Sequence, residues 1–286
     1  IKGYSGKKDA APILVRSLGK MEYRGYDSVG IATKNGNIID VKKGVGKVSE
    51  VSQNLQLDGM LGTIGIGHTR WATHGKVTKE NAHPHYSNSG KIAIVHNGII
   101  ENFQELKDQL VLDGFTFQSD TDSEIIANLI QQKFEETGNI KETIIESISK
   151  LKGHYSFMVI FEDGTLAAAR LREPLVIGVE KDGYYISSDV LGFIEKTDNA
   201  IYIDNENFVV INNLDLKIFD FNGISIKPNI TTVSKEFADV YKGDYAHFTL
   251  KEISEQNETI LVSRNTTQIE QVSREIQNTK LSLIHI

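Results

Sequence analysis

Residues 121–134, Thr-Asp-Ser-Glu-Ile-Ile-Ala-Asn-Leu-Ile-Gln-Gln-Lys-Phe, carry the pattern that decides the fold class. Their apolar side chains recur at the spacing of one helix face, and Thr121 with Glu124 matches a capping box at a helix start. The same periodicity continues over residues 140–151. The sequence therefore predicts two amphipathic helices in mid-chain, each with an apolar face to bury.

Strands are predicted on both sides of these helices. Short, closely spaced runs rich in Val, Ile and aromatic residues are typical of antiparallel pairing. Asn35-Gly36 is expected to form a two-residue type I′ turn between the first two strands. Together with a helix expected over residues 10–21, the pattern indicates an α+β domain with helices packed outside a pair of sheets. The predicted strands cover residues 30–34, 37–41, 63–69, 92–96, 155–161, 165–169, 175–179, 184–187, 208–211, 217–221 and 224–226.

The character of the chain changes after about residue 227. Residues 233–279 have many charges, little strand pattern and a loosely helical spacing of apolar side chains. One interpretation is a C-terminal helical tail, and the other is a linker to a second domain whose first strand would begin at Leu281. We expect a first domain over residues 1–227, followed over residues 228–286 by a helical linker and the truncated start of a second domain.

Composition excludes several classes of function. The formal net charge is −7 and the basic residues form no stripe, so neither nucleic acid nor anionic lipid is an expected partner. No apolar run is long enough to span a bilayer and no signal peptide is recognisable, which favours a cytoplasmic setting. The printed chain contains no cysteine, so thiol chemistry would have to come from outside it. Because the sequence starts at Ile1 rather than Met, further residues are expected upstream.

Three segments combine residue types that suit an amino-acid substrate. Arg70 ends an apolar strand and offers a planar fork for a carboxylate, with the Thr73 hydroxyl nearby. Asp122, at a helix start, is suited to an ammonium group. Asn97-Gly98 offers a side-chain amide and an unobstructed backbone N–H to a developing oxyanion. The segments are residues 67–75, 95–102 and 119–124.

Each of these residues also has an ordinary structural interpretation. Taken alone, Arg70 is more often a surface ion-pair residue, Asn97-Gly98 a turn and Asp122 a helix cap. Trp71, the only tryptophan, is more often part of a core than of a pocket. Only their combination carries a functional hypothesis.

Histidine clustering offers a competing hypothesis. Five of the chain's eight histidines lie between residues 68 and 96, and combinations of them could bind Zn²⁺. However, no His-Glu-x-x-His motif or carboxylate at helical ligand spacing accompanies them. Histidines beside Thr, Trp and Asn at strand ends are more often hydrogen-bonded framework, so no metal site is predicted. The five are His68, His74, His83, His85 and His96.

The order and spacing of five motifs resemble the glutaminase domain of the glucosamine-6-phosphate synthase family. The purine-pathway phosphoribosyl amidotransferases have the same fold but different residues around the Arg and Asn-Gly motifs. The motifs are Tyr23-Arg-Gly-Tyr-Asp-Ser28, Gly67-His-Thr-Arg-Trp-Ala-Thr-His-Gly75, Asn81-Ala-His-Pro-His85, His96-Asn-Gly-Ile-Ile-Glu-Asn102 and Thr121-Asp-Ser-Glu124.

The resemblance implies an N-terminal-nucleophile hydrolase fold, a four-layer αββα sandwich of antiparallel sheets. It also implies a catalytic cysteine two residues before Ile1, whose own α-amino group serves as the base. The oxyanion hole would consist of the Asn97 side chain and the Gly98 N–H. The implied substrate is L-glutamine, which is hydrolysed to glutamate and ammonia without a cofactor.

The resemblance assigns the remaining site residues to substrate binding. Arg70 and Thr73 would hold the α-carboxylate of glutamine, and Asp122 with the Gly98 carbonyl its ammonium group. Three further residues complete this set, with Arg24 supporting the N-terminal end while Trp71 and His74 line the pocket. A C-terminal isomerase domain, absent from this chain, would bind fructose 6-phosphate and make glucosamine 6-phosphate in a homodimer of the full-length protein.

Two other functions compete with this one. A non-catalytic module that binds an amino acid would share the pocket but lack the thiol, and the coding sequence upstream of Ile1 separates the two. A histidine-based metallohydrolase would instead carry stoichiometric zinc.

Overall fold

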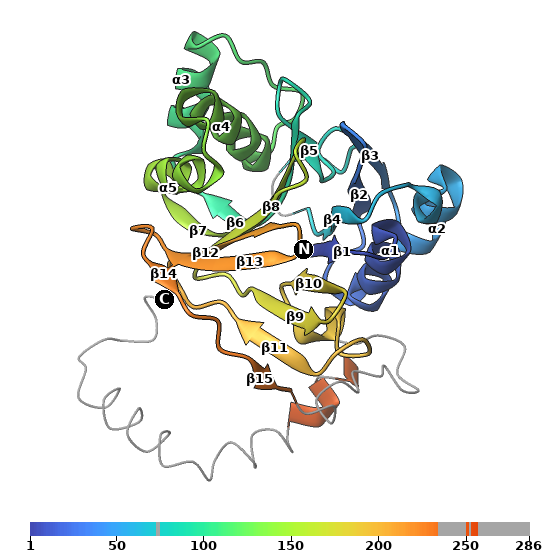
Figure 1. Ribbon diagram of the computed structural model, residues 1–286. Coiled ribbons are helices and arrows are strands. Elements are labelled where there is room, and N and C mark those ends of the chain that lie inside the picture. The colour runs from blue at the N-terminus through green and yellow to red at the C-terminus, as the bar shows by residue number, and fades with distance from the viewer. Residues whose placement is uncertain (73–74, 234–249, 252, 257–286) are drawn as a thin grey trace, which may run out of the picture. The chain divides into compact units, whose positions relative to one another are not determined.

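A computed structural model describes residues 1–72, 75–233, 250–251 and 253–256 of the chain (Figure 1). The chain divides into two units, Ile1–Ala238 and Asp239–Ile286. All the described strands lie in the first unit. In the second unit, residues 250–251 and 253–256 are helical.

The described strands form two sheets in which neighbouring strands run antiparallel, as the sequence predicts. One sheet has the order β15-β11-β9-β10-β1-β4-β2-β3, and the other has the order β14-β13-β12-β8-β7-β6-β5. The strands are β1 (Lys2–Gly6), β2 (Ser28–Asn35), β3 (Ile38–Val45), β4 (Ile64–Arg70), β5 (His85–Tyr86), β6 (Ile92–Ile100), β7 (Gly153–Phe161), β8 (Leu166–Leu171), β9 (Val176–Glu180), β10 (Gly183–Ser187), β11 (Asn199–Tyr202), β12 (Asn207–Asn212), β13 (Asp215–Asp220), β14 (Ser225–Ile226) and β15 (Thr231–Thr232).

The helices of the first unit include both predicted mid-chain helices. Short 3₁₀ turns also occur at Glu22–Arg24, Leu57–Gly59 and Val190–Gly192. Within the described ranges, no helix has both the length and the hydropathy needed to cross a bilayer. The α-helices are α1 (Ala10–Lys20), α2 (Val48–Leu55), α3 (Phe103–Leu112), α4 (Asp122–Thr137) and α5 (Ile140–Lys150).

Alternate side chains of β6 enter two different cores. Successive residues of a strand point to opposite faces of the sheet. Ile92 and Ile94 therefore pack with the buried residues of α4 and α5, whereas Ala93 and Val95 pack against the facing sheet. The neighbouring strand β7 divides its side chains between the same two cores. This sheet is thus covered by helices on one face and by the other sheet on its opposite face.

A third core lies on the outer face of the other sheet, which contains β2. Leu14 and Leu18 of α1 pack there with Ile31 of β2 and with Val48 and Val51 of α2. Figure 1 shows α3–α5 on one side of the paired sheets and α1 and α2 on the other. The layers follow in the order helices, sheet, sheet, helices, which confirms the predicted αββα sandwich.

The first hairpin differs in detail from the sequence prediction. Asn35 pairs with Ile38, so its loop consists of Gly36 and Asn37 rather than Asn35 and Gly36. Gly36 has a φ of 58°, and Asn37 is not among the residues with positive φ. A type I′ turn needs positive φ at both loop residues. The expected turn type is therefore wrong, because pairing along the strands extends β2 by one residue.

The start of α4 is also built differently from a capping box. Thr121 is the N-cap, but its side chain makes no cap hydrogen bond. Its hydroxyl instead lies 3.1 Å from His85 Nε2. The buried Glu124 carboxylate reaches past the N-cap and accepts hydrogen bonds from the backbone N–H groups of Gln118 and Ser119. The carboxylate therefore fixes the loop that leads into the helix, rather than the first turn alone.

Replacing Glu124 with Ala is expected to lower the free energy of unfolding by about 2–4 kcal/mol, because two backbone N–H groups beneath it lose their acceptor. Urea denaturation measures the loss. Glu146→Ala, at an exposed position of α5, is the matched control and should leave the midpoint within experimental error. Equal midpoints for the two variants would contradict this account of the loop.

The sheet continues beyond residue 227. Thr231 pairs with Ala200 of β11, and the Val233 N–H donates to the Asp198 carbonyl. The domain boundary placed at residue 227 stays a prediction. The strand expected from Leu281 lies outside the described residues.

Candidate functional site

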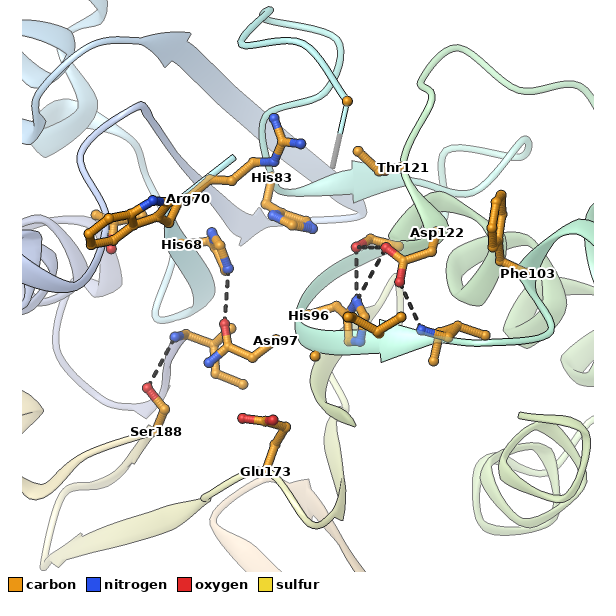
Figure 2. A pocket seen from close by; sticks show the side chains of 18 of the residues that line it. His68, Arg70, His83, His96, Asn97, Phe103, Thr121, Asp122, Glu173 and Ser188 are labelled. Atoms are coloured by element: carbon orange, nitrogen blue, oxygen red, sulfur yellow. Dashed lines mark hydrogen bonds and ion pairs between the residues drawn. The ribbon is translucent and has the colours of Figure 1, made fainter. Parts of the chain in front are cut away.

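A cavity of about 630 Å³ opens in the first unit, with walls from both sheets and from the start of α4. Figure 2 shows the side chains that point into it. Five of the residues predicted from the sequence line it together with Ile1. They are Arg70, Trp71, Asn97, Gly98 and Asp122.

Strand alternation explains why polar groups gather here. Ile64 and Ile66 of β4 face the core between the sheets, and the same face of the strand continues with His68 and Arg70. On β6 the core-facing positions lead in the same way to Asn97. The core between the sheets therefore changes from apolar to polar at one end, and the cavity lies there.

Asn97 is held by a contact between the two sheets. Its Oδ1 lies 3.0 Å from Nε2 of His68, and because a carbonyl oxygen only accepts, the imidazole nitrogen carries the hydrogen. Burial lowers the pKa of His68 well below its usual value. The imidazole is thus neutral. The two donors of the Asn97 amide are left for a ligand in the cavity.

Gly98, the next residue along β6, has a backbone conformation that favours glycine. Its φ is 110°, and an added Cβ would overlap the carbonyl oxygen of His154 on β7. A side chain at this position would therefore be strained both by the backbone angle and by the close neighbouring strand. The residue presents bare backbone to the cavity, as an oxyanion site requires.

Asp122 lies at the first position of α4 and is tied to the end of β6. Its Oδ2 accepts a 2.9 Å hydrogen bond from the Ile100 N–H, and its Oδ1 lies 3.9 Å from Nδ1 of His96. His96 Nδ1 lies closer to the Ser123 hydroxyl, at 2.9 Å. Burial lowers the pKa of His96, although the Asp122 carboxylate opposes that shift. The carboxylate is thus oriented while it remains half-buried at the cavity wall.

Arg70 supplies the cation of the site. Its guanidinium is buried, and Nη1 donates a 3.2 Å hydrogen bond to the Lys76 carbonyl. Burial lowers the pKa of Arg70, while Asp27 and Asp122 oppose the shift. A guanidinium carries five donors in a fixed fork, which suits a carboxylate.

Trp71 lines the cavity and is not a core residue. It is 56% exposed, and its ring lies 5.7 Å from that of Tyr26 at the rim of the cavity. Arg24 lies in the 3₁₀ turn Glu22–Arg24, and its side chain lies outside the described part of the structure. Thr73 and His74 lie outside the described residues altogether.

Glu173 is a wall residue that the sequence did not single out. It lies in the β8–β9 connection and lines the cavity beside Pro174, and its Oε1 lies 3.0 Å from Nδ1 of His154. No local pattern marks a carboxylate in such a connection. Only the meeting of segments distant in sequence brings it to the site.

The rings of His68, His83 and His85 pack against one another rather than around a shared metal position. The His68 and His83 rings are 4.2 Å apart, and those of His83 and His85 are 4.7 Å apart. Burial lowers the pKa of both His83 and His85 well below the usual value. Among the residues that the structure describes, no group of three His, Asp or Glu side chains is arranged to hold a metal ion.

Comparisons with known proteins bear on this site. A family model described as "Glutamine amidotransferase domain" matches residues 56–257. The chain is 41% identical over 262 residues to a glutamine–fructose-6-phosphate aminotransferase (isomerizing) of Clostridium acetobutylicum, covering 91% of this chain and 43% of that protein. A protein of the same name from Pyrococcus horikoshii is 43% identical over 263 residues, which are 91% of this chain and 44% of that protein.

A solved structure agrees with the sequence comparisons. The glutamine phosphoribosylpyrophosphate amidotransferase of B. subtilis superposes with a TM-score of 0.67 at 31% identity, covering 80% of this chain and 50% of that one. This chain spans less than half the length of the curated relatives above. The family model nevertheless covers most of the chain. The chain belongs to the glutamine amidotransferase domain family.

Proposed function

We propose that this domain binds L-glutamine and hydrolyses its side-chain amide to give glutamate and ammonia. The observation that carries the proposal is the convergence of Arg70, Asp122 and Asn97-Gly98 on one cavity beside Ile1. A guanidinium and a carboxylate match the two charges of a free amino acid. The Asn97 amide and the Gly98 backbone match the oxyanion that forms when its amide is attacked.

In this proposal the nucleophile is the thiol of a cysteine two residues before Ile1. The Ile1 nitrogen lies 3.3 Å from the Ser188 hydroxyl, and both residues line the cavity. Two further residues span at most about 7 Å, so the thiol would stay beside the oxyanion site. The α-amino group of that cysteine would take the thiol proton, since its ordinary pKa is about 7.7–8.0.

The chemistry then proceeds in two balanced steps. The thiolate attacks the amide carbon, the C–N bond breaks, and ammonia leaves with the proton that the α-amino group had taken. Water next attacks the thioester, which releases glutamate and restores the thiol. Asn97 and Gly98 would stabilise the oxyanion in both steps, and Arg70 and Asp122 would hold the substrate in place.

The names of the relatives support a wider role. We propose that the ammonia is passed to fructose 6-phosphate, bound by a C-terminal isomerase domain, for the synthesis of glucosamine 6-phosphate. Residues 1–227 would form the glutaminase domain and residues 228–286 the linker to that second domain. The full-length protein would act in the cytoplasm as a homodimer.

A chain of the printed sequence has no cysteine, so its binding of L-glutamine tests the pocket separately from catalysis. L-glutamine is expected to raise the thermal midpoint in the millimolar range, and D-glutamine is not, because its ammonium, carboxylate and side chain do not fit three fixed partners at once. Calorimetry gives the affinity. Stabilisation by both enantiomers, or by neither, would count against the proposal.

Asp122→Asn provides a matched test of the ammonium site. It keeps an acceptor for the Ile100 N–H but removes the charge, so the affinity for L-glutamine is expected to fall about tenfold or more. Asp108→Asn, at an exposed position of α3 outside the cavity, should bind like the unmodified chain.

A further inference from the structure

The contact between His68 and Asn97 joins the two sheets inside the site. His68 lies on β4 of one sheet and Asn97 on β6 of the other, and their side chains meet at 3.0 Å (Figure 2). His68 is buried, whereas Asn97 is half-buried at the cavity wall. Because the bond crosses between sheets, it fixes an orientation that neither strand determines alone.

The bond decides which end of the Asn97 amide faces the substrate. A carboxamide is nearly symmetric in shape, and a half-turn exchanges its oxygen with its nitrogen. With the oxygen held by the His68 N–H, the nitrogen faces the cavity and offers donors to an oxyanion. The opposite orientation would place a carbonyl oxygen against the developing negative charge and repel it.

The surroundings of His68 keep its donor in place. The ring of His83 packs against it at 4.2 Å with an interplanar angle of 52°. Burial disfavours a second proton on the ring, and the cationic Arg70 does so as well. The ring is therefore neutral, and it donates its one N–H, at Nε2, to Asn97.

We propose that His68 is a positioning residue of the oxyanion hole, which holds the Asn97 carboxamide with its nitrogen toward the reacting amide. This inference rests on the proposed glutaminase function. In this proposal His68 acts through its hydrogen bond to Asn97. Its loss should lower the rate of the chemical steps more than the binding of glutamine.

The test uses the full chain with Cys-Gly added before Ile1 and compares His68→Leu with His68→Gln. Leucine has no donor, whereas the glutamine amide nitrogen takes the place of Nε2. His68→Leu is expected to lower kcat about 10–10²-fold, with KM changed less than about threefold, since one oxyanion donor is worth about 10²–10³ and is here misoriented rather than removed. His68→Gln should keep kcat within about fivefold of the parent chain.

A double-mutant cycle separates positioning from general damage to the fold. In an Asn97→Ala background, His68→Leu should cause little further loss of kcat, because the group it positions is gone. If the role of His68 were purely structural, His68→Leu would lower kcat in both backgrounds, and the His68→Gln variant would not restore kcat. Either of those results overturns the inference.

A second pair of variants covers the case in which His68→Leu does not fold. His68→Asn is polar like His68→Gln, but its amide does not extend to the Nε2 position. His68→Asn should therefore resemble a loss of the donor, and equal kcat values for the two would contradict the inference. Absence of glutaminase activity in the parent Cys-Gly chain would instead overturn the proposed function, which is thereby distinguished from failure of the inference.

Discussion

A polypeptide that carries Cys-Gly in front of Ile1 is expected to hydrolyse L-glutamine at least about 10³-fold faster than a chain of the printed sequence, which has no cysteine. The cavity would already hold the substrate and the oxyanion donors, so the thiol supplies the missing covalent step. Glutamate formation, followed enzymatically, gives the rate. The magnitude reflects the cost of removing a nucleophile from a site whose other parts stay in place.

Two controls assign that gain to the thiol and to its own amino group. Ala-Gly in front of Ile1 restores the backbone without the thiol and should remain at the background rate. Ala-Cys-Gly retains the thiol but moves the free amino group away from it, and should lose most of the activity because the base is displaced. Equal rates for the Cys-Gly and Ala-Gly chains would show that the activity does not depend on a nucleophile at this place.

Arg70→Ala is expected to weaken the binding of L-glutamine by at least about 10²-fold, which is the loss of one or two charge-assisted hydrogen bonds. Arg70→Lys keeps the charge but not the planar fork, and should lose about tenfold. Titration calorimetry on the printed chain measures both. The effect should exceed that of Asp122→Asn, since the guanidinium contributes several donors and is more deeply buried.

The control for Arg70 is another arginine outside the cavity. Arg16 on α1 is exposed, and its ion pair with Glu195 at 2.9 Å is of a kind that contributes little. Arg16→Ala should bind L-glutamine like the parent chain. Urea unfolding of both variants shows whether the buried Arg70 also supports the fold. An unchanged affinity in a folded Arg70→Ala variant would remove the carboxylate site from the proposal.

Much of the fold follows from local periodicity. The apolar spacing around Ile125 and Ile130 predicts α4, and the short run rich in Ile and Val over residues 92–96 predicts β6, because both patterns are properties of a short stretch of backbone. Local rules failed where a partner decides the outcome. The first hairpin turns one residue later than its Asn-Gly pair suggests, since pairing with β3 carries Asn35 into the strand.

The residues of the site also divide into those that a local sequence pattern indicates and those that only the tertiary structure reveals. Arg70, Asn97 and Asp122 stand out in the sequence because each lies at or next to the end of a predicted element and has the chemistry of an amino-acid site. His68 was visible only as one of several histidines, and Glu173 had no local signal at all. Their roles depend on which strand faces which, and that depends on packing between residues far apart in the chain.

By itself, the sequence determined many of the elements, their order and the kinds of chemical group near their ends. The tertiary structure decided that β4 and β6 belong to different sheets and that His68 of one meets Asn97 of the other. The physical reason is that side-chain direction alternates by local geometry, whereas the facing of two sheets is set by the burial of their shared core. The polar end of that core, where the proposed chemistry takes place, is therefore a product of the assembled sandwich.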